Sequence, residues 1–195
     1  MDSPSGLLQT FLDNLAPMLS ADFAGPVRAI DTNRIRTGQT SSPDLPVLRF
    51  WPAVTAKGGK LVEPLAGLAP HYQWVQNPNY VASPPDPRFL QNYGYVVLAG
   101  PGGLVESGEL ALGFLMLGPG THYPTHRHPA VEIYVVAAGS AEWRKGGEPW
   151  HIEPPGSVIR HETMMPHATR TLSEPLLAVY IWRGDLRTHA RIVAR

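Results

Sequence analysis

The sequence GTHYPTHRHPAVEIYVVAAG, residues 120–139, decides how this chain folds and indicates what it binds. His126, His128, Glu132 and Tyr134 occupy positions of one parity, and an extended chain points such residues to the same face of a sheet. Pro129 lies between the two pairs and interrupts the ladder of hydrogen bonds. Two imidazoles and a carboxylate that converge from adjacent strand segments are a common ligand set for Zn, Fe, Mn or Ni. The stretch therefore predicts a metal site on paired strands.

Short apolar runs separated by Gly and Pro fill the chain between residues 93 and 183. The runs cover residues 93–99, 109–117, 131–137, 141–144, 150–153, 157–160 and 175–182. Turn signals such as GPGG at 100–103 and PPG at 154–156 separate them. This pattern predicts an all-β fold, an antiparallel sandwich or barrel. We place this barrel at residues 93–195, with a short C-terminal tail. The four-residue spacing of Arg183, Arg187, Arg191 and Arg195 in this tail favours an exposed helix face.

Residues 1–92 have a different pattern. Apolar residues at 7, 8, 11, 12, 15, 18 and 19 follow the spacing of one helix face, and Pro17 predicts where that helix kinks or ends. Residues 70–92 hold five prolines among several aromatic side chains, which is typical of an irregular covering loop. We therefore predict that residues 1–92 form a helical and loop extension that packs on the barrel.

The composition excludes several classes of protein. Its 16 Lys and Arg residues balance 16 Asp and Glu residues, so the chain has no basic field for binding nucleic acid. It contains no cysteine, so a metal site must use histidine, carboxylate or phenolate ligands. No stretch approaches the roughly 18 apolar residues of a membrane span, and the first residues lack the features of a signal peptide. We predict a cytoplasmic protein with neither a nucleic-acid nor a membrane partner.

The histidine-rich stretch resembles the first motif of the cupin superfamily. Gly120, His126, His128, Glu132 and Gly139 fit every spacing of that motif. The second cupin motif is matched more loosely, by Gly156 and by the Pro166-His167 pair eleven positions on; His161 is the alternative for the last ligand. The resemblance implies a cupin β-barrel, a double-stranded β-helix or jelly roll, with an N-terminal α-helical extension. It also implies metal binding by His126, His128, Glu132 and His167, but a cupin fold alone does not determine the reaction.

A narrower resemblance concerns the dimethylsulfoniopropionate lyases among the cupins. It rests on the pattern YPxHxHPAxExY at 123–134, GxAxW at 139–143 and PHA at 166–168. The extension of about 90 residues before the barrel and Trp182 near its end are similar to the longer, Q-type branch of that family. The resemblance implies cleavage of dimethylsulfoniopropionate to dimethyl sulfide and acrylate. It implies that Tyr134 is a phenol close to the metal and that Tyr123 is a second phenol of the active site.

Elementary chemistry agrees with these residue types. A β-elimination needs a base for the proton next to the carboxylate, and one divalent metal ion, such as Zn, Fe or Mn, stabilises the charge that develops there. A neighbouring dication favours the phenolate form of tyrosine, so Tyr134 is the expected base. Aromatic faces attract a sulfonium cation, and Trp182, Tyr180 and Tyr123 are the expected substrate-binding residues, with the aromatic residues of 71–93 as further candidates.

The sequence leaves other readings open. The same ligand set serves cupin sugar isomerases and dioxygenases, and a cupin can also be a non-enzymatic small-molecule-binding protein. The neutral charge balance fits a small zwitterionic sulfonium substrate without selecting one. The chain could be a monomer or a homodimer.

Overall fold

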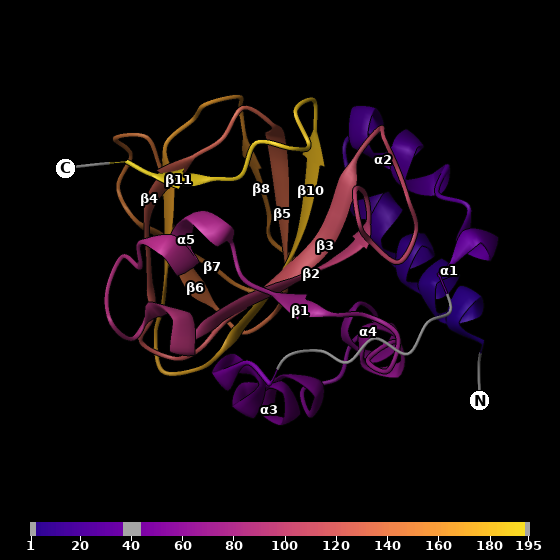
Figure 1. Cartoon of the computed structure of the whole chain (residues 1–195), viewed down its shortest axis with the longest axis horizontal. Helices are drawn as coiled ribbons and strands as arrows, with labels where there is room; N and C mark the ends of the chain where they lie inside the picture. The colour runs from indigo at the N-terminus through magenta and orange to yellow at the C-terminus, as the bar shows by residue number, and fades with distance from the viewer. Residues whose placement is uncertain (1–2, 37–43, 194–195) are drawn as a thin grey trace.

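Two antiparallel sheets face each other in the computed structural model, which describes residues 3–36 and 44–193. Sheet A has the order β1-β2-β3-β10-β5-β8, and sheet B has the order β11-β4-β9-β6-β7. The strands are β1 (Trp74–Val75), β2 (Tyr93–Ala99), β3 (Ala111–Leu117), β4 (His122–Arg127), β5 (Val131–Ala138), β6 (Ala141–Lys145), β7 (His151–Glu153), β8 (Val158–His161), β9 (His167–Thr171), β10 (Leu176–Arg183) and β11 (Arg191–Ile192). The predicted fold class, an all-β barrel of the cupin type with a helical extension, is confirmed (Figure 1).

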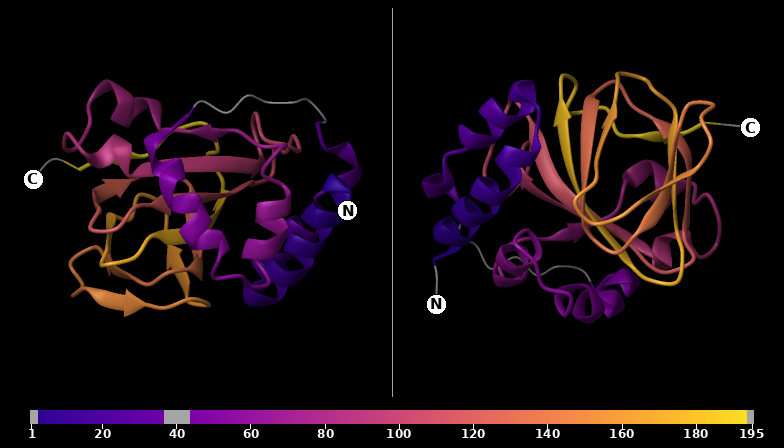
Figure 2. Two further views of the ribbon diagram at one scale, coloured as in Figure 1. Left: turned by 90° about the horizontal axis from the view of Figure 1, so that it is seen from below. Right: turned by 180° about the vertical axis from the view of Figure 1, so that it is seen from behind.

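The N-terminal helices cover the outer face of sheet A. They are α1 (Pro4–Leu15), α2 (Ala21–Arg28), α3 (Trp51–Thr55) and α4 (Val62–Gly67), and Figure 2 shows them on one side of the barrel. Helix α1 is capped by Ser3, whose side chain accepts a hydrogen bond from the Gly6 amide at 3.1 Å, a common N-cap. It gives way to a 3-10 turn that contains Pro17, as the sequence predicts.

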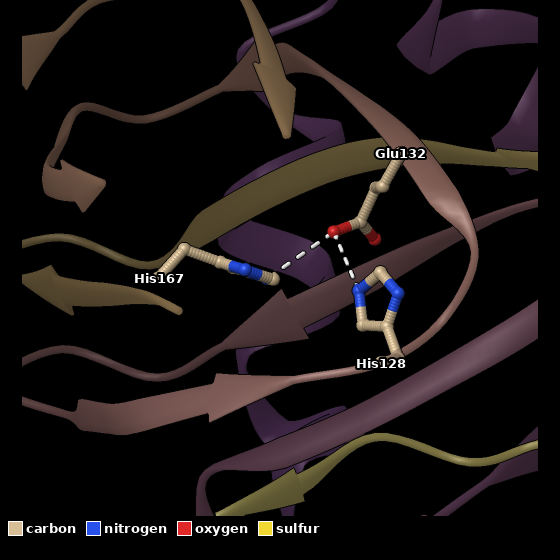
Figure 3. Close-up of side chains that lie close together, drawn as sticks. All are labelled: His128, Glu132 and His167. Carbon is tan, nitrogen blue, oxygen red and sulfur yellow. Dashed lines mark hydrogen bonds and ion pairs between the residues drawn. The ribbon is translucent and has the colours of Figure 1, made fainter. Parts of the chain in front are cut away.

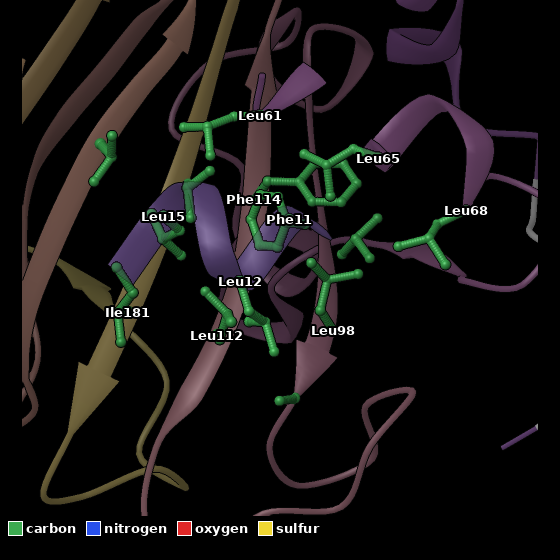
Figure 4. Packing of buried hydrophobic residues seen from close by; sticks show 14 of the residues in the cluster. Phe11, Leu12, Leu15, Leu61, Leu65, Leu68, Leu98, Leu112, Phe114 and Ile181 are labelled. Carbon is green, nitrogen blue, oxygen red and sulfur yellow. The ribbon is translucent and has the colours of Figure 1, made fainter. Parts of the chain in front are cut away.

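The central strands of sheet A, β3, β5 and β10, are buried on both faces, which explains their continuous apolar sequences. In β5, Ile133 and Val135 belong to an outer core that packs against the helices, whereas Tyr134 and Val136 belong to an inner core between the sheets. Figure 4 shows the outer core, in which Phe11 of α1 lies among side chains of α4 and of the sheet. The helices therefore fix sheet A from outside and leave its inner face free to build a site.

The segment between α4 and β2 has a different place from the outer helices. It contains α5 (Pro78–Ala82), and its residues Tyr80 and Phe89 join the inner core. Part of the predicted extension thus closes one end of the barrel instead of packing on its outside. The division of the chain at residue 92 stays a prediction.

The C-terminal segment has no helix between residues 184 and 193, so the predicted helical face of Arg183, Arg187 and Arg191 is wrong; Arg195 lies outside the described residues. Arg191 and Ile192 instead pair with β4 as β11, because backbone pairing with the edge of sheet B takes the place of a free helix. Among the described residues, none of the helices is long and apolar enough to cross a membrane. The cytoplasmic location stays a prediction.

Candidate metal centre and active-site pocket

Three buried side chains meet inside the barrel. Glu132 projects inward from β5, His167 is the first residue of β9, and His128 lies in the turn between β4 and β5. The Glu132 Oε2 atom is 3.1 Å from His128 Nε2 and 3.2 Å from His167 Nε2 (Figure 3). The ligand atoms of this group all lie within 4.8 Å of one another, so the group could hold a metal ion.

Hydrogen bonds to the backbone fix the tautomers of the histidines. The Nδ1 atoms of His126, His128 and His167 each lie 2.8 to 3.1 Å from a carbonyl oxygen two residues away. Because a carbonyl oxygen only accepts, each Nδ1 carries a proton, and Nε2 is the ring nitrogen left to bind a metal ion. In the group of His128, Glu132 and His167, two Nε2 atoms and a carboxylate oxygen therefore face one another. Such a donor set is stable when a cation lies between the donors, and the backbone carbonyls hold the rings as they commonly hold metal-binding histidines.

Burial and charge set the protonation of the group. Burial would raise the pKa of the Glu132 carboxyl, but the imidazoles of His128, His161 and His167 hold this pKa well below its usual range. Burial also lowers the pKa of His126 well below its usual value and lowers the pKa of His161 to about 4. The centre thus combines a carboxylate with two neighbouring imidazoles, His126 and His161, that burial keeps neutral.

A small pocket opens beside this centre. Its cavity volume is about 150 Å³, and its wall includes several tyrosines and one tryptophan. The wall includes all three predicted substrate-binding residues, Tyr123, Tyr180 and Trp182, together with Glu132 and Tyr134. The pocket therefore offers aromatic faces and one carboxylate-bearing centre to a small molecule.

Residues 39–178 match the sequence profile of the dimethylsulfoniopropionate lyase family. This chain belongs to that family. It is 41% identical over 100 residues to the dimethylsulfoniopropionate lyase DddQ of Ruegeria pomeroyi, an alignment that covers 51% of the chain and spans about half, 50%, of that curated relative.

Two crystal structures are similar to the chain over almost their whole length. That of the lyase DddQ from Ruegeria pomeroyi has a TM-score of 0.81 at 27% sequence identity and covers 98% of this chain and 97% of its own. A second structure, from work on the dimethylsulfoniopropionate lyases RdDddP and RnDddQII, has a TM-score of 0.75 at 26% identity and covers 98% and 100%. The similarity includes the helical extension as well as the barrel, so it supports the predicted Q-type branch of the dimethylsulfoniopropionate lyase family.

In this member of the lyase family, Trp182 holds the carboxylate of the centre. The pairing of β10 with β5 sets Trp182 opposite Glu132, and the Trp182 Nε1 donates a hydrogen bond to Glu132 Oε1 at 2.5 Å. The indole also stacks on His128, with ring centroids 4.1 Å apart and planes inclined by 25°. Tyr180 contributes its ring to the pocket, but its hydroxyl is directed away, donating to the carbonyl of Val96 at 3.1 Å.

Tyr134 lies next to the carboxylate, as its position two residues beyond Glu132 predicts. Burial, the charge of Glu132 and a hydrogen bond to that carboxylate raise the pKa of the Tyr134 phenol well above its ordinary value. Without a cation, this phenol therefore remains protonated and donates to Glu132. A dication at the centre would reverse the sign of the local charge and favour the phenolate.

A β-bulge brings Tyr123 and His126 to the same face. Opposite Thr169 and His167 of β9, strand β4 has one extra residue between Tyr123 and His126, so two residues of opposite parity both point inward. Their rings stack with centroids 3.9 Å apart and planes 5° apart. The Tyr123 hydroxyl is 3.0 Å from the hydroxyl of Tyr80 on α5. Tyr80, in the segment before β2, thus fixes the hydroxyl of Tyr123, one of the two predicted active-site phenols.

The remaining predicted ligands lie beside the group. The ring centroid of His126 is 4.1 Å from that of His167 and 6.5 Å from that of His128, so its role as a ligand stays a prediction. His161, the alternative to His167, stacks on His167 at 3.9 Å, and its Nδ1 is 3.6 Å from Glu132 Oε2.

Sequence reasoning missed several residues of the pocket, among them Asn77, Leu186 and His189. The side chains of Asn77 and Asn79 both donate to the carbonyl of Ala190, at 3.0 and 3.1 Å, which holds the C-terminal segment against the mouth. No local pattern in the sequence reveals this contact, because it joins segments more than a hundred residues apart. Asn77, the N-cap residue of α5, is the one local indication of this contact, and an asparagine there indicates a helix cap as readily as a site.

Proposed function

We propose that the chain is a metal-dependent carbon–sulfur lyase that cleaves dimethylsulfoniopropionate to dimethyl sulfide and acrylate. The observation that carries the proposal is the convergence of His128 Nε2, His167 Nε2 and Glu132 Oε2 at the edge of a pocket with several aromatic side chains. Membership of the dimethylsulfoniopropionate lyase family supports this choice of substrate.

The proposed ligands are His128, Glu132, His167 and the neighbouring His126. Imidazole and carboxylate donors suit zinc, iron and manganese, and we propose one such divalent ion. When bound, this ion supplies Lewis-acid stabilisation of the negative charge that develops on the substrate carboxylate.

Tyr134 is the proposed base. Its phenolate oxygen takes the proton from the carbon next to the carboxylate, the electrons of that C–H bond form the new C=C bond, and the C–S bond breaks so that its electrons leave with neutral dimethyl sulfide. The other product is acrylate. Tyr123 belongs to the same inner core as Tyr134, and the hydroxyl of Tyr80 holds its hydroxyl in place. Tyr123 is the proposed second phenol, which hydrogen bonds to the reacting substrate.

The aromatic wall is the proposed binding site of the sulfonium group. Trp182, Tyr180 and Tyr123 line the pocket, and each aromatic face can contribute about 0.5–2 kcal/mol of attraction to a desolvated cation. The cavity of about 150 Å³ suits a small substrate of this kind.

The test is release of dimethyl sulfide into the headspace above purified protein loaded with Zn, Fe, Mn, Co or Ni and supplied with dimethylsulfoniopropionate. Chelator-treated protein and a Glu132→Gln variant are the negative controls, and His151→Gln, a change of an exposed residue on β7, is the matched positive control. Absence of release with every metal would refute the proposed reaction.

A further inference from the structure

His161 differs from the other buried histidines of the barrel. It is the last residue of β8, it is fully buried, and the pairing of β8 with β5 sets it directly opposite Glu132. His126, His128 and His167 each bind a backbone carbonyl through Nδ1, whereas neither ring nitrogen of His161 has a hydrogen-bond partner within the described part of the chain. The backbone therefore does not fix its tautomer, and a buried polar ring without partners calls for another explanation.

The ring of His161 touches two members of the proposed metal centre at once. Its plane lies 13° from that of His167, with the ring centroids 3.9 Å apart. Its Nδ1 is 3.6 Å from Glu132 Oε2, slightly beyond hydrogen-bond distance. A movement of about 0.5 Å would bring these two atoms within that distance.

We propose that His161 is a positioning residue that orients Glu132 through an Nδ1–H group and steadies His167 by stacking. This inference rests on the proposed metal site. Once the Nε2 atoms of His128 and His167 face a metal ion, they have no proton to offer to Glu132. His161 then holds the imidazole N–H group nearest to Oε2, while the indole of Trp182 holds Oε1.

Two substitutions of matched shape separate the hydrogen bond from packing. His161→Asn keeps an N–H donor near the position of Nδ1, and His161→Leu has a similar size with no donor. The measurement is the zinc affinity of each purified protein, by competition with a fluorescent chelator. Loss of a residue that orients a ligand commonly costs about 10–100-fold in metal affinity, so His161→Leu should bind zinc about 10–100-fold more weakly than the unmodified chain. His161→Asn should recover most of this loss, and His151→Leu on exposed β7 should bind like the unmodified chain.

The other outcomes separate failure of this inference from failure of the proposed function. Equal affinity of His161→Leu and the unmodified chain would overturn it, as would equal losses in the Asn and Leu variants, since these would assign the effect to packing. If the unmodified chain bound no metal, the proposed metal site would fail together with it. If the chain bound zinc and released no dimethyl sulfide, the proposed reaction would fail and the positioning role of His161 would still be decided by the variants.

The unmodified protein provides a second measurement that needs no variant to fold. Long-range ¹⁵N–¹H correlation spectra of the zinc-loaded chain, labelled at histidine, report which ring nitrogen of His161 carries its proton. The inference requires the proton on Nδ1. A proton on Nε2 would overturn it, whatever the affinities of the variants.

Discussion

Lowering the pH should destabilise the metal-free protein through His161. Burial lowers the pKa of this side chain from 6.5 to about 4, so the unfolded chain binds more protons than the folded chain between these two values. The folded-state pKa is the lower one. Its contribution to stability is therefore fully present above pH 6.5 and is lost as the pH falls toward about 4.

The size of the loss follows from the two pKa values. Between about pH 7.5 and about pH 5, one group with pKa values of 6.5 unfolded and about 4 folded lowers the free energy of unfolding by about 2 kcal/mol. His161→Leu removes this titration. The variant can be less stable at neutral pH, but its stability should fall by about 2 kcal/mol less over the same interval.

Urea unfolding in the presence of a chelator, followed by tryptophan fluorescence at both pH values, measures this difference. His151→Leu is the matched control, because His151 is exposed on β7, and it should retain the full loss of the unmodified chain. Parallel losses in the unmodified chain and His161→Leu would show that burial does not hold His161 neutral, and the reasoning would be wrong.

Three further substitutions test other parts of the site. Tyr134→Phe should abolish most release of dimethyl sulfide while zinc affinity stays within about threefold; activity close to that of the unmodified chain would remove Tyr134 as the base. Trp182→Phe keeps a stacking ring but loses the hydrogen bond to Glu132, which should cost about 1.5–3 kcal/mol in metal binding, measured by chelator competition; an unchanged affinity would contradict this role. Gly113→Ala would put a Cβ 1.9 Å from the carbonyl oxygen of Val96, so urea unfolding should show a loss of about 3 kcal/mol, and a fully stable variant would be inconsistent with the packing described.

The strands and the centre could be predicted from local patterns. Apolar runs of strand length between Gly and Pro turns gave the barrel, because backbone pairing and burial of both faces leave a strong signal in the sequence. His128 and Glu132 could be identified from their spacing, which is typical of metal ligands on strands, and His167 from the resemblance to the second cupin motif. The structure brings the ligand atoms of His128, Glu132 and His167 within 4.8 Å of one another.

Other parts of the site were not accessible from local patterns. The parity argument assumed a regular strand, but Tyr123 faces the same side as His126 because β4 contains a bulge, and bulges depend on the partner strand. Tyr80 could not be placed because residues 74–91 have no periodicity and pack where the barrel end leaves room. Likewise, the arginine spacing after residue 182 favoured a helix, whereas tertiary pairing with β4 produced β11.

The position of β10 in sheet A determines the order in which the molecule can be assembled. This strand lies between β3 and β5, although it follows β5 by more than 35 residues in the chain and β3 by more than 55. Until β10 is in place, β3 and β5 each present an unpaired edge, and Tyr180 and Trp182 are not yet beside the metal centre. We therefore expect slow folding, dominated by pairing between distant segments, with the pocket among the last features to form. A metal that binds only the finished centre would stabilise the native protein by mass action without accelerating the first steps of folding.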